Sequence, residues 1–289
     1  MEPAIRRRLA VITGGCGGIG LACAREFGRA HDLVLADISA ERLDQVSKGL
    51  TEEGYRVVGS VAGDLADVAT LASLSVCVRD HGTLGVIAHT AGVSSGMADW
   101  KSIIRTNVVG TTRLLDNMEP FLTNRTVAVL IASVAGHLAP ANGEVDRLLD
   151  TPYADDLFDQ VEHILVNAGG GIGDDSFNYS GLSGPAYGLS KRATVRAAAL
   201  RSARWAEKGA RIVSISPGII DTPMGRYEVE HGEAAAAVLE QTPLRRWGTP
   251  MDIAMAAAFL ASDQASFITG TDLRVDGGMI PARLGEKCW

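Results

Sequence analysis

A glycine-rich turn between an apolar run and a helical run constrains the fold of this chain more than any other feature. The run LAVIT at residues 9–13 predicts a buried strand, and the pattern T-G-x-x-x-G-I-G continues from it through Thr13, Gly14, Gly18, Ile19 and Gly20. Glycines at these positions let a pyrophosphate approach backbone N–H groups, and the N-terminus of the following helix attracts an anion. A flexible turn is the alternative, but the order of strand, turn and helix favours a dinucleotide site.

Further apolar runs alternate with helical patterns along the rest of the chain. They predict six more strands, at 32–37, 55–64 with its exit loop, 84–92, 126–133, 210–218 and 272–278. Strands that are apolar nearly throughout, and are each followed by a helix, are typical of a parallel sheet buried on both faces. We therefore predict an α/β fold in which residues 1–289 form a single Rossmann-type domain, a doubly wound sheet of seven parallel strands with helices on both faces.

The segment from about His137 to Gly184 breaks this alternation. It is rich in Gly, Asp and Asn, with a modest amphipathic stretch around residues 150–165. The glycines at 169–171 and 173 also resemble a phosphate loop, but Asp174 and Asp175 would place carboxylates against a phosphate and no helix is expected to follow. We predict an insertion within the domain rather than a second nucleotide site.

Composition and charge argue against several classes of protein. A chain of 289 residues with 46% hydrophobic and 21% charged residues can bury a sizeable core. The net charge of −7, with no basic cluster beyond residues 6–8, argues against a nucleic-acid partner. Glycines soon interrupt the apolar run after this cluster, and no other run approaches membrane-spanning length, so we expect a cytoplasmic protein without a membrane partner. No CxxC pair or metal-ligand spacing occurs among Cys16, Cys23, Cys77 and Cys288, so no metal is expected.

Asp37 is the first clue to the cofactor. It closes the second predicted strand, 23 residues after Gly14, where a carboxylate can bind the 2′-hydroxyl of a ribose. A 2′-phosphate would be repelled by this carboxylate, and the turn from Gly14 to Gly20 contains no Arg or Lys to neutralise the phosphate. The pattern favours NAD over NADP, with a surface role for Asp37 as the alternative.

Tyr187 and Lys191 supply the candidate chemistry. They are four residues apart in a segment whose Ala, Arg and Leu content favours a helix, so both project from one face. A tyrosine with an ordinary pKa of about 10 is a poor proton acceptor near neutral pH, and a nearby lysine cation is expected to lower that pKa. The pair gains weight because it follows a dinucleotide pattern, an Asn-bearing helical segment and a strand that ends at Ser133.

These motifs together resemble the short-chain dehydrogenase/reductase family over nearly the whole chain. The resemblance implies that Tyr187 exchanges a proton with the substrate oxygen, that Ser133 hydrogen-bonds this oxygen, that Lys191 holds the nicotinamide ribose, and that Asn107 anchors a water molecule that links Lys191 to solvent. It also implies NAD-binding positions at Asp64, Leu65, Ala91, Gly92, Tyr187, Lys191, Pro217, Gly218, Ile220 and Thr222. Taken alone, Asn107 could bond backbone within its own helix, and Ser133 could be a strand-end turn residue.

Two departures from the family pattern concern structure and substrate. His89-Thr90-Ala91-Gly92 replaces the usual Asn-Asn-Ala-Gly, which predicts a structural role for His89. The long interval between Ser133 and Tyr187 resembles the bacterial 3α-hydroxysteroid dehydrogenase/carbonyl reductase branch. We therefore expect a secondary alcohol or ketone substrate, a hydroxysteroid or another bulky cyclic compound, with a terpene alcohol or dihydrodiol as the alternative. A non-catalytic NAD-binding protein is the rival from another class, although such proteins commonly lose the tyrosine or lysine.

Two expectations concern regions outside the tetrad. A mobile substrate lid is expected at about residues 222–250, where glycines at 225, 232 and 248 interrupt the pattern and Met224, Tyr227, Val238 and Leu239 offer apolar surface. The family resemblance implies a homo-oligomer, a dimer or tetramer, which many members form through the helix that carries the tyrosine.

Overall fold

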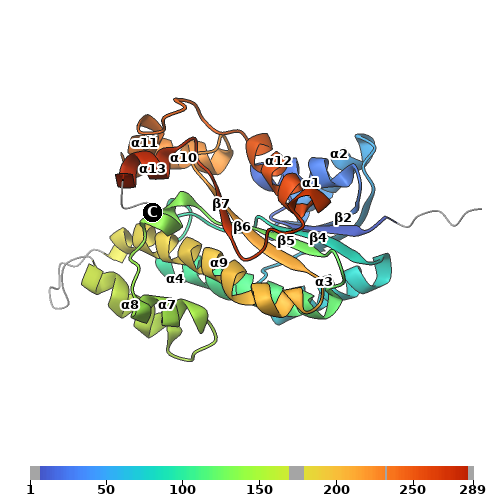
Figure 1. Ribbon diagram of the computed structural model, residues 1–289, viewed down its shortest axis with the longest axis horizontal. Coiled ribbons are helices and arrows are strands. Elements are labelled where there is room, and N and C mark those ends of the chain that lie inside the picture. The colour runs from blue at the N-terminus through green and yellow to red at the C-terminus, as the bar shows by residue number, and fades with distance from the viewer. Residues whose placement is uncertain (1–6, 169–178, 232, 286–289) are drawn as a thin grey trace, which may run out of the picture.

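A parallel sheet of seven strands forms the centre of the molecule (Figure 1). The computed structural model describes residues 7–168, 179–231 and 233–285. The strand order is β3-β2-β1-β4-β5-β6-β7. The strands are β1 (Leu9–Thr13), β2 (Asp32–Asp37), β3 (Val57–Ala62), β4 (Leu84–His89), β5 (Val127–Ile131), β6 (Arg211–Pro217) and β7 (Asp272–Val275). The predicted doubly wound sheet is confirmed, because the order reverses direction beside β1, where the chain crosses from β3 to β4.

The exposure of the strands follows their position in the sheet. Every residue of β1, β4 and β5 is buried, whereas the edge strands β3 and β7 are mostly half-buried or exposed. The near-continuous apolar runs of the central strands are therefore explained by helices on both faces. The predicted strand at 84–92 is too long, since β4 ends at His89 and the next three residues form a loop at the carboxyl edge of the sheet.

Helices cover the two faces of the sheet as separate layers (Figure 1). One layer consists of α1 (Gly18–Gly28), α2 (Ala40–Glu52) and α12 (Pro250–Ala261). The other consists of α3 (Val68–His81), α5 (Thr111–Met118) and α9 (Ser183–Ala206). Ser39 caps α2 by accepting a hydrogen bond from Arg42 N–H, as the sequence predicted. Trp205, near the end of α9, is fully buried under the sheet.

A widened helical turn precedes α5. The chain passes from α4 (Trp100–Ile103) into a π-helix, η1 (Ile104–Gly110), and then into α5. Asn107 lies within the π-helix. Such turns are rare and are frequently found at functional sites. Short 3₁₀ turns follow at η2 (Glu119–Phe121), η3 (Tyr179–Leu182) and η4 (Asp263–Ala265).

The segment predicted as an insertion contains helices of its own. They are α6 (Val134–Leu138), α7 (Gly143–Asp150) and α8 (Leu157–Ala168), and in Figure 1 α7 and α8 lie beyond α9 on the side away from the sheet. The apolar side chains of α7 and α8 join α4, η1 and the start of α9 in one buried cluster. Two arginines of α9 anchor α7 at its surface: Arg192 pairs with Asp146 at 2.7 Å and Arg196 with Asp150 at 2.6 Å. The glycines at 169–171 and 173, with Asp174 and Asp175, lie outside the described residues.

The C-terminal part supplies helices near the carboxyl edge of the sheet. They are α10 (Pro223–His231), α11 (Glu233–Glu240) and α13 (Met279–Leu284), which lie together in Figure 1. Gly225 lies inside α10, so its predicted role as a break is wrong; its added Cβ would stand 2.1 Å from the Ile220 carbonyl, and the close approach explains the glycine. Gly232 lies outside the described residues. Within the described ranges, no helix is both long and apolar enough to cross a membrane.

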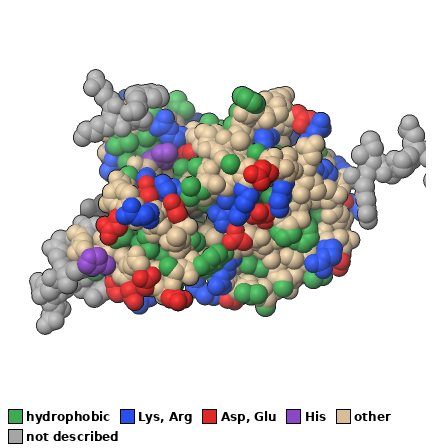
Figure 2. Space-filling view, turned by 60° about the horizontal axis from the view of Figure 1, so that its bottom comes forward, with side chains coloured by type: hydrophobic (Ala, Val, Ile, Leu, Met, Phe, Trp, Pro, Cys, Tyr) green, Lys and Arg blue, Asp and Glu red, His purple; other side chains and the backbone are tan. Residues whose placement is uncertain are grey.

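Charged side chains of both signs share the face that carries α7 and α9. Figure 2 shows basic and acidic groups next to one another there rather than in separate patches. The ion pairs between α7 and α9 contribute to this arrangement. Among the cysteines in the described ranges, Cys16 and Cys23 are buried, Cys77 is half-buried, and all three are free thiols; Cys288 lies outside those ranges.

Candidate active site

The glycine-rich turn between β1 and α1 is built from close backbone contacts. Gly14 has a φ of +65°, and a Cβ there would lie 2.7 Å from the Ala91 backbone nitrogen. A Cβ on Gly20 would lie 2.0 Å from the Gly14 carbonyl oxygen. Larger residues would therefore push the turn away from α1 and from the loop after β4. These contacts place Gly14, Gly20, Ala91 and Gly92 at one corner of the carboxyl edge, as a dinucleotide site requires.

The N-terminus of α1 is suited to an anion. Its cap residue, Gly17, has no side chain to satisfy the first backbone N–H groups. The partial positive charge of these groups points to the space beside Gly18 and Ile19. A Cβ on Gly18 would stand 2.7 Å from the Thr222 methyl carbon, so the loop after β6 closes one side of this space. The corner therefore fits the pyrophosphate of a nicotinamide dinucleotide.

Asp37 lies over the same turn. Its carboxylate accepts a hydrogen bond from Cys16 N–H at 3.0 Å, so Asp37 is not merely a surface residue. The Arg42 guanidinium lies there too and donates to the Cys16 carbonyl at 2.7 Å. The turn at residues 14–20 contains no cation of its own, and Arg42 reaches it from the first turn of α2. Burial, together with the Asp37 charge, raises the pKa of Cys16 to about 12, so this thiol stays protonated.

Two further loops contain the remaining positions assigned to the cofactor. After β3, Asp64 accepts a hydrogen bond from Ala66 N–H and pairs with Arg105 at 3.2 Å, while Leu65 is buried. After β6, Pro217 ends the strand and Gly218 approaches Asp276 so closely that a Cβ would stand 2.9 Å from its Cα. Ile220 and Thr222 follow, with Thr222 N–H donating to the Ile220 carbonyl. Both loops lie at the carboxyl edge of the sheet, where ligands bind in open α/β folds.

Ser133 and Tyr187 meet although they are far apart in sequence. Ser133 caps α6 by accepting from Ala135 N–H, so the turn role considered above is real. It also hydrogen-bonds the Tyr187 side chain, which lowers the pKa of the tyrosine. Burial has the larger effect and raises the Tyr187 pKa, and the Glu228 charge raises it further. Tyr187 is therefore a proton donor near neutral pH in this arrangement.

Lys191 lies one helical turn after Tyr187 and is buried. Its Nζ is 5.6 Å from the centre of the Tyr187 ring and donates to the Ile131 carbonyl at 3.0 Å. Burial lowers the pKa of Lys191 to about 8, partly opposed by Glu228. Burial thus raises the pKa of Tyr187 in these surroundings, and a lowering of that pKa by Lys191 stays a prediction.

Asn107 connects the loop after β4 to α9. Its side chain accepts from Val93 N–H and donates to the Val93 carbonyl, both at 2.9 Å, and it also donates to Ser190 Oγ at 3.0 Å. It therefore bonds a neighbouring loop rather than only its own helix. The role of a water molecule bound by Asn107 stays a prediction.

His89 bridges β1 and the π-helix, which agrees with a structural role. Its ring nitrogens lie 2.7 Å from Thr13 Oγ1 and 2.8 Å from Thr111 Oγ1, and Thr111 donates to the Asn107 carbonyl at 2.6 Å. Burial lowers the pKa of His89 to about 3. Because a neutral ring has one donor and Thr111 already uses its hydrogen, Nε2 donates to Thr111 and Nδ1 accepts from Thr13.

Two polar residues near the tetrad were not predicted from the sequence. Glu228 lies on α10, inside the predicted lid, and its charge acts on both Tyr187 and Lys191. Ser94, five residues after His89, is fully buried and lies beside the Glu228 carboxyl, whose pKa it lowers. No sequence spacing links these residues, since the packing of α10 on the loop after β4 brings them together.

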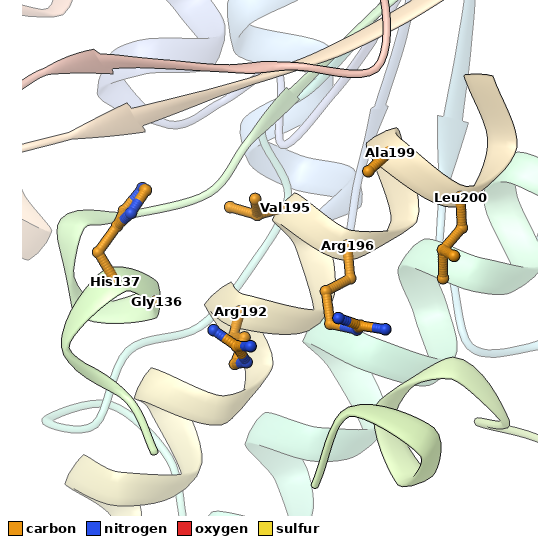
Figure 3. A pocket seen from close by; sticks show the side chains of 7 residues that line it. All are labelled: Gly136, His137, Arg192, Val195, Arg196, Ala199 and Leu200. Atoms are coloured by element: carbon orange, nitrogen blue, oxygen red, sulfur yellow. The ribbon is translucent and has the colours of Figure 1, made fainter. Parts of the chain in front are cut away.

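Two cavities lie along α9, and neither is lined by Ser133 or Tyr187. One, of about 290 Å³, opens between α6 and α9 (Figure 3). The side chains of His137, Arg192 and Arg196 point in different directions there, and both arginines pair with carboxylates of α7. The other, of about 590 Å³, lies between α5, α9 and the residues that follow α7. In the part of the chain that the structure describes, no three His, Cys, Asp or Glu side chains gather as a metal site would require.

Comparison with known proteins identifies the family. Residues 8–145 match the family model for short chain dehydrogenase, and residues 172–280 match one described as enoyl-(acyl carrier protein) reductase. A short-chain dehydrogenase/reductase of Alternaria brassicicola is 30% identical over 274 residues, which cover 92% of this chain and 93% of the relative. The chain therefore belongs to the short-chain dehydrogenase/reductase family and is an oxidoreductase.

Other relatives differ in their named substrates. A galactitol 2-dehydrogenase (L-tagatose-forming) from Cereibacter sphaeroides is 26% identical, with 93% of both chains covered. The crystal structure of a 3-alpha-hydroxysteroid dehydrogenase from Pseudomonas sp. B-0831, complexed with NADH, superposes with a TM-score of 0.70 at 26% identity. The match covers 96% of this chain and 99% of that one. The chain therefore shares its fold with this enzyme over nearly its whole length.

Proposed function

We propose that this protein interconverts a secondary alcohol and a ketone with NAD as the hydride carrier. The observation that carries the proposal is the contact between Ser133 and Tyr187, with Lys191 buried one turn away, beside a glycine-rich corner shaped for a dinucleotide. In the ketone-reducing direction the substrate oxygen gains negative charge. A protonated Tyr187 and the Ser133 hydroxyl are two donors positioned to stabilise this charge, and Tyr187 then gives its proton to the oxygen.

Each element of the site has a distinct task. The glycine-rich corner and the N-terminus of α1 would hold the pyrophosphate, and Asp37 would hold the adenosine ribose. Bound NAD supplies the hydride-accepting carbon of its nicotinamide ring. Lys191 has a pKa of about 8, so it is largely protonated at neutral pH and can hydrogen-bond a ribose hydroxyl. Asn107 holds the loop after β4 against α9 and thereby keeps the tetrad together.

The choice of NAD rests on Asp37. Its carboxylate ends β2 beside the glycine-rich turn, and a 2′-phosphate held there would meet a like charge. Arg42 is the one feature that favours NADP, but its guanidinium already bonds the Cys16 carbonyl. The NADH bound to the hydroxysteroid dehydrogenase neighbour supports the same choice.

We propose a bulky cyclic alcohol or ketone, such as a hydroxysteroid, as the substrate. The structural likeness to the 3-alpha-hydroxysteroid dehydrogenase supports this class, as does the segment α7–α8, which packs on α4 and on the start of α9 close to Tyr187. A terpene alcohol or dihydrodiol is the alternative. The helices α10 and α11 would cover such a substrate, with Val238 of α11 packed against Val134 and Met279 rather than exposed to it. We further propose that the protein acts in the cytoplasm as a homo-oligomer.

Initial rates on a panel of hydroxysteroids, terpene alcohols, dihydrodiols and simple secondary alcohols, with NAD and with NADP, test this function. We expect NAD-dependent turnover that falls by about 10²–10⁴-fold in Tyr187→Phe, because the proton donor is lost. Tyr153→Phe, which removes an exposed hydroxyl bonded to Asp116, is the matched control and should keep full activity. Tight NAD binding without turnover of any compound would instead support a non-catalytic protein.

A further inference from the structure

The orientation of Ser133 depends on the short helix α6, of which it is the N-cap. Its hydroxyl accepts from Ala135 N–H at 3.2 Å, and its backbone carbonyl accepts from Gly136 N–H at 2.9 Å. The helix packs directly on α9, since a Cβ on Gly136 would stand 2.7 Å from the Lys191 carbonyl carbon. The direction of the Ser133 hydroxyl therefore follows the position of α6.

The C-terminal helix α13 makes a further contact with α6. Val134, the first residue of α6, is buried in one apolar cluster with Val238 of α11 and with Met279 and Ile280 of α13. The two α13 residues are almost completely buried, at 0% and 1% exposure. α13 has no part in the proposed catalytic roles, although this cluster begins one residue from Ser133. The packing of α13 thus helps to set where the first turn of α6 lies.

Hydrogen bonds and two glycines fix the path of the chain into α13. Asp276 accepts from Gly278 N–H at 2.9 Å and from Ile280 N–H at 2.8 Å. Gly277 and Gly278 have φ of +63° and +87°, a region that residues with a Cβ rarely adopt. A Cβ on Gly277 would stand 2.7 Å from the Thr242 methyl carbon, so this turn also packs on the chain that follows α11. α13 is therefore anchored at both β7 and α11.

We propose that α13 positions the Ser133 hydroxyl for catalysis, with Met279 and Ile280 as positioning residues that act through Val134. The inference rests on the proposed function, in which this hydroxyl donates to the substrate oxygen. Hydrogen bonds weaken steeply as their angle departs from the preferred range, so a small shift of α6 reduces the stabilisation of the developing charge. Truncating a side chain of the cluster should cause such a shift, because the surrounding structure partly relaxes into the cavity.

A double-mutant cycle tests this positioning role. Initial rates with NAD are measured on the best alcohol of the panel for the wild type, Ile280→Ala, Ser133→Ala and the double variant. We expect Ser133→Ala to lower kcat about 10²-fold, and Ile280→Ala to lower kcat about tenfold with an unchanged KM for NAD. In the Ser133→Ala background, Ile280→Ala should cause no further loss, because the group that it positions is already absent.

Ile212→Ala is the matched control. Ile212 is as deeply buried as Ile280 but lies at the amino end of β6, away from the site. Its truncation removes the same side chain from another part of the core and should leave kcat unchanged. Where the alanine variants do not fold, Ile280→Val and Ile212→Val make the same comparison with a smaller cavity. An equal loss of kcat from the Ile280 variant in both backgrounds, or no loss in either, overturns the proposal.

Amide hydrogen exchange separates this inference from the proposed function, because it requires no turnover. Mass spectrometry follows a peptide that contains Ala135 N–H and Gly136 N–H in the wild type, Ile280→Ala and Ile212→Ala. We expect this peptide to exchange about tenfold faster in Ile280→Ala and at the wild-type rate in Ile212→Ala. That result supports the contact of α13 with α6 even if no alcohol is oxidised, in which case only the proposed function fails. Unchanged exchange in Ile280→Ala overturns the inference.

Discussion

Two corners of the site lie at the same edge of the sheet but depend on different parts of the chain. The cofactor corner comprises residues 13–20 with Asp37, and the catalytic corner comprises Asn107, Ser133, Tyr187 and Lys191. The cofactor corner consists of backbone contacts that only glycine permits, as at Gly14 and Gly20. The catalytic corner consists of side chains from η1, from the N-cap of α6 and from α9, and burial shifts the pKa values of Tyr187 and Lys191. The first corner depends on shape, and the second depends on electrostatic surroundings.

This difference predicts how each corner fails. A larger side chain in the cofactor corner should disturb folding and cofactor binding together, because backbone atoms cannot move aside. A substitution in the catalytic corner should leave the fold intact and change protonation or rate. The following experiments test this contrast, beginning with the largest expected effect on stability or cofactor binding.

Gly20→Ala tests the cofactor corner directly. The added Cβ would stand 2.0 Å from the Gly14 carbonyl oxygen, so we expect a loss of about 3 kcal/mol in the free energy of unfolding and a large loss of NAD affinity. Urea unfolding and NAD titration measure the two effects. Gly49→Ala in α2 is the control, because nothing lies within 4 Å of its Cβ position; it should stabilise the protein slightly. Equal stability of the two variants would contradict the packing argument.

Asp37→Ser tests how the cofactor corner selects its ligand. Removing the carboxylate ends the repulsion of a 2′-phosphate and leaves Arg42 nearby. We expect the ratio of kcat/KM for NADP to that for NAD to rise at least tenfold, equivalent to about 1.4 kcal/mol. Asp44→Ser, an exposed residue of α2 paired with Lys48, should leave the ratio unchanged. A ratio that stays at the wild-type value would show that residues other than Asp37 select the cofactor.

His89→Asn tests whether the buried histidine beside the catalytic corner lowers the free energy of unfolding at acid pH. Burial lowers the folded-state pKa of His89 to about 3, below the ordinary value of about 6.5. The unfolded chain therefore binds a proton first, so the stability due to neutral His89 is complete above pH 6.5 and is lost as the pH falls towards 3. We expect the wild type to lose up to about 1.4 kcal/mol more per pH unit than the variant in this window.

Unfolding by urea between pH 7 and 4 measures this difference. His163→Asn, at an exposed site on α8, is the control and should follow the wild type. Parallel pH profiles for the wild type and His89→Asn would show that His89 does not limit stability in acid.

Asp146→Asn tests the attachment of α7 to α9 and has the smallest expected effect. Asp146 pairs with both Arg192 and Arg196, and the Arg192 side chain holds its pKa below the ordinary value. Because these groups are partly exposed, we expect a loss of about 1 kcal/mol or less, which shrinks at high salt. Thermal unfolding at low and high salt measures it, with Glu53→Gln at the exposed Arg25 pair as the control. A loss that is independent of salt would point to packing rather than charge.

The sequence was sufficient for features that repeat locally. The apolar runs predicted all seven strands, because burial on both faces requires nearly every residue of a central parallel strand to be apolar. The order of strand, glycine turn and helix predicted the cofactor corner because its glycine pattern lies within residues 13–20, whereas the contacts of this turn with Ala91 and Thr222 appear only in the fold. Strand ends were less accurate, as at residues 90–92, because a loop packed against the sheet is also partly apolar.

Only the tertiary structure decided what surrounds the catalytic side chains. The four tetrad residues were predicted one by one, but the net pKa shift of Tyr187 depends on burial and on Glu228, 41 residues later in the chain. Arg42 and Ser94 likewise enter the site because α2 and the loop after β4 fold over it. Desolvation and charge act through space and depend on distances that no spacing in the sequence encodes, so the chain's own pattern determined the scaffold while packing determined the chemistry of the site.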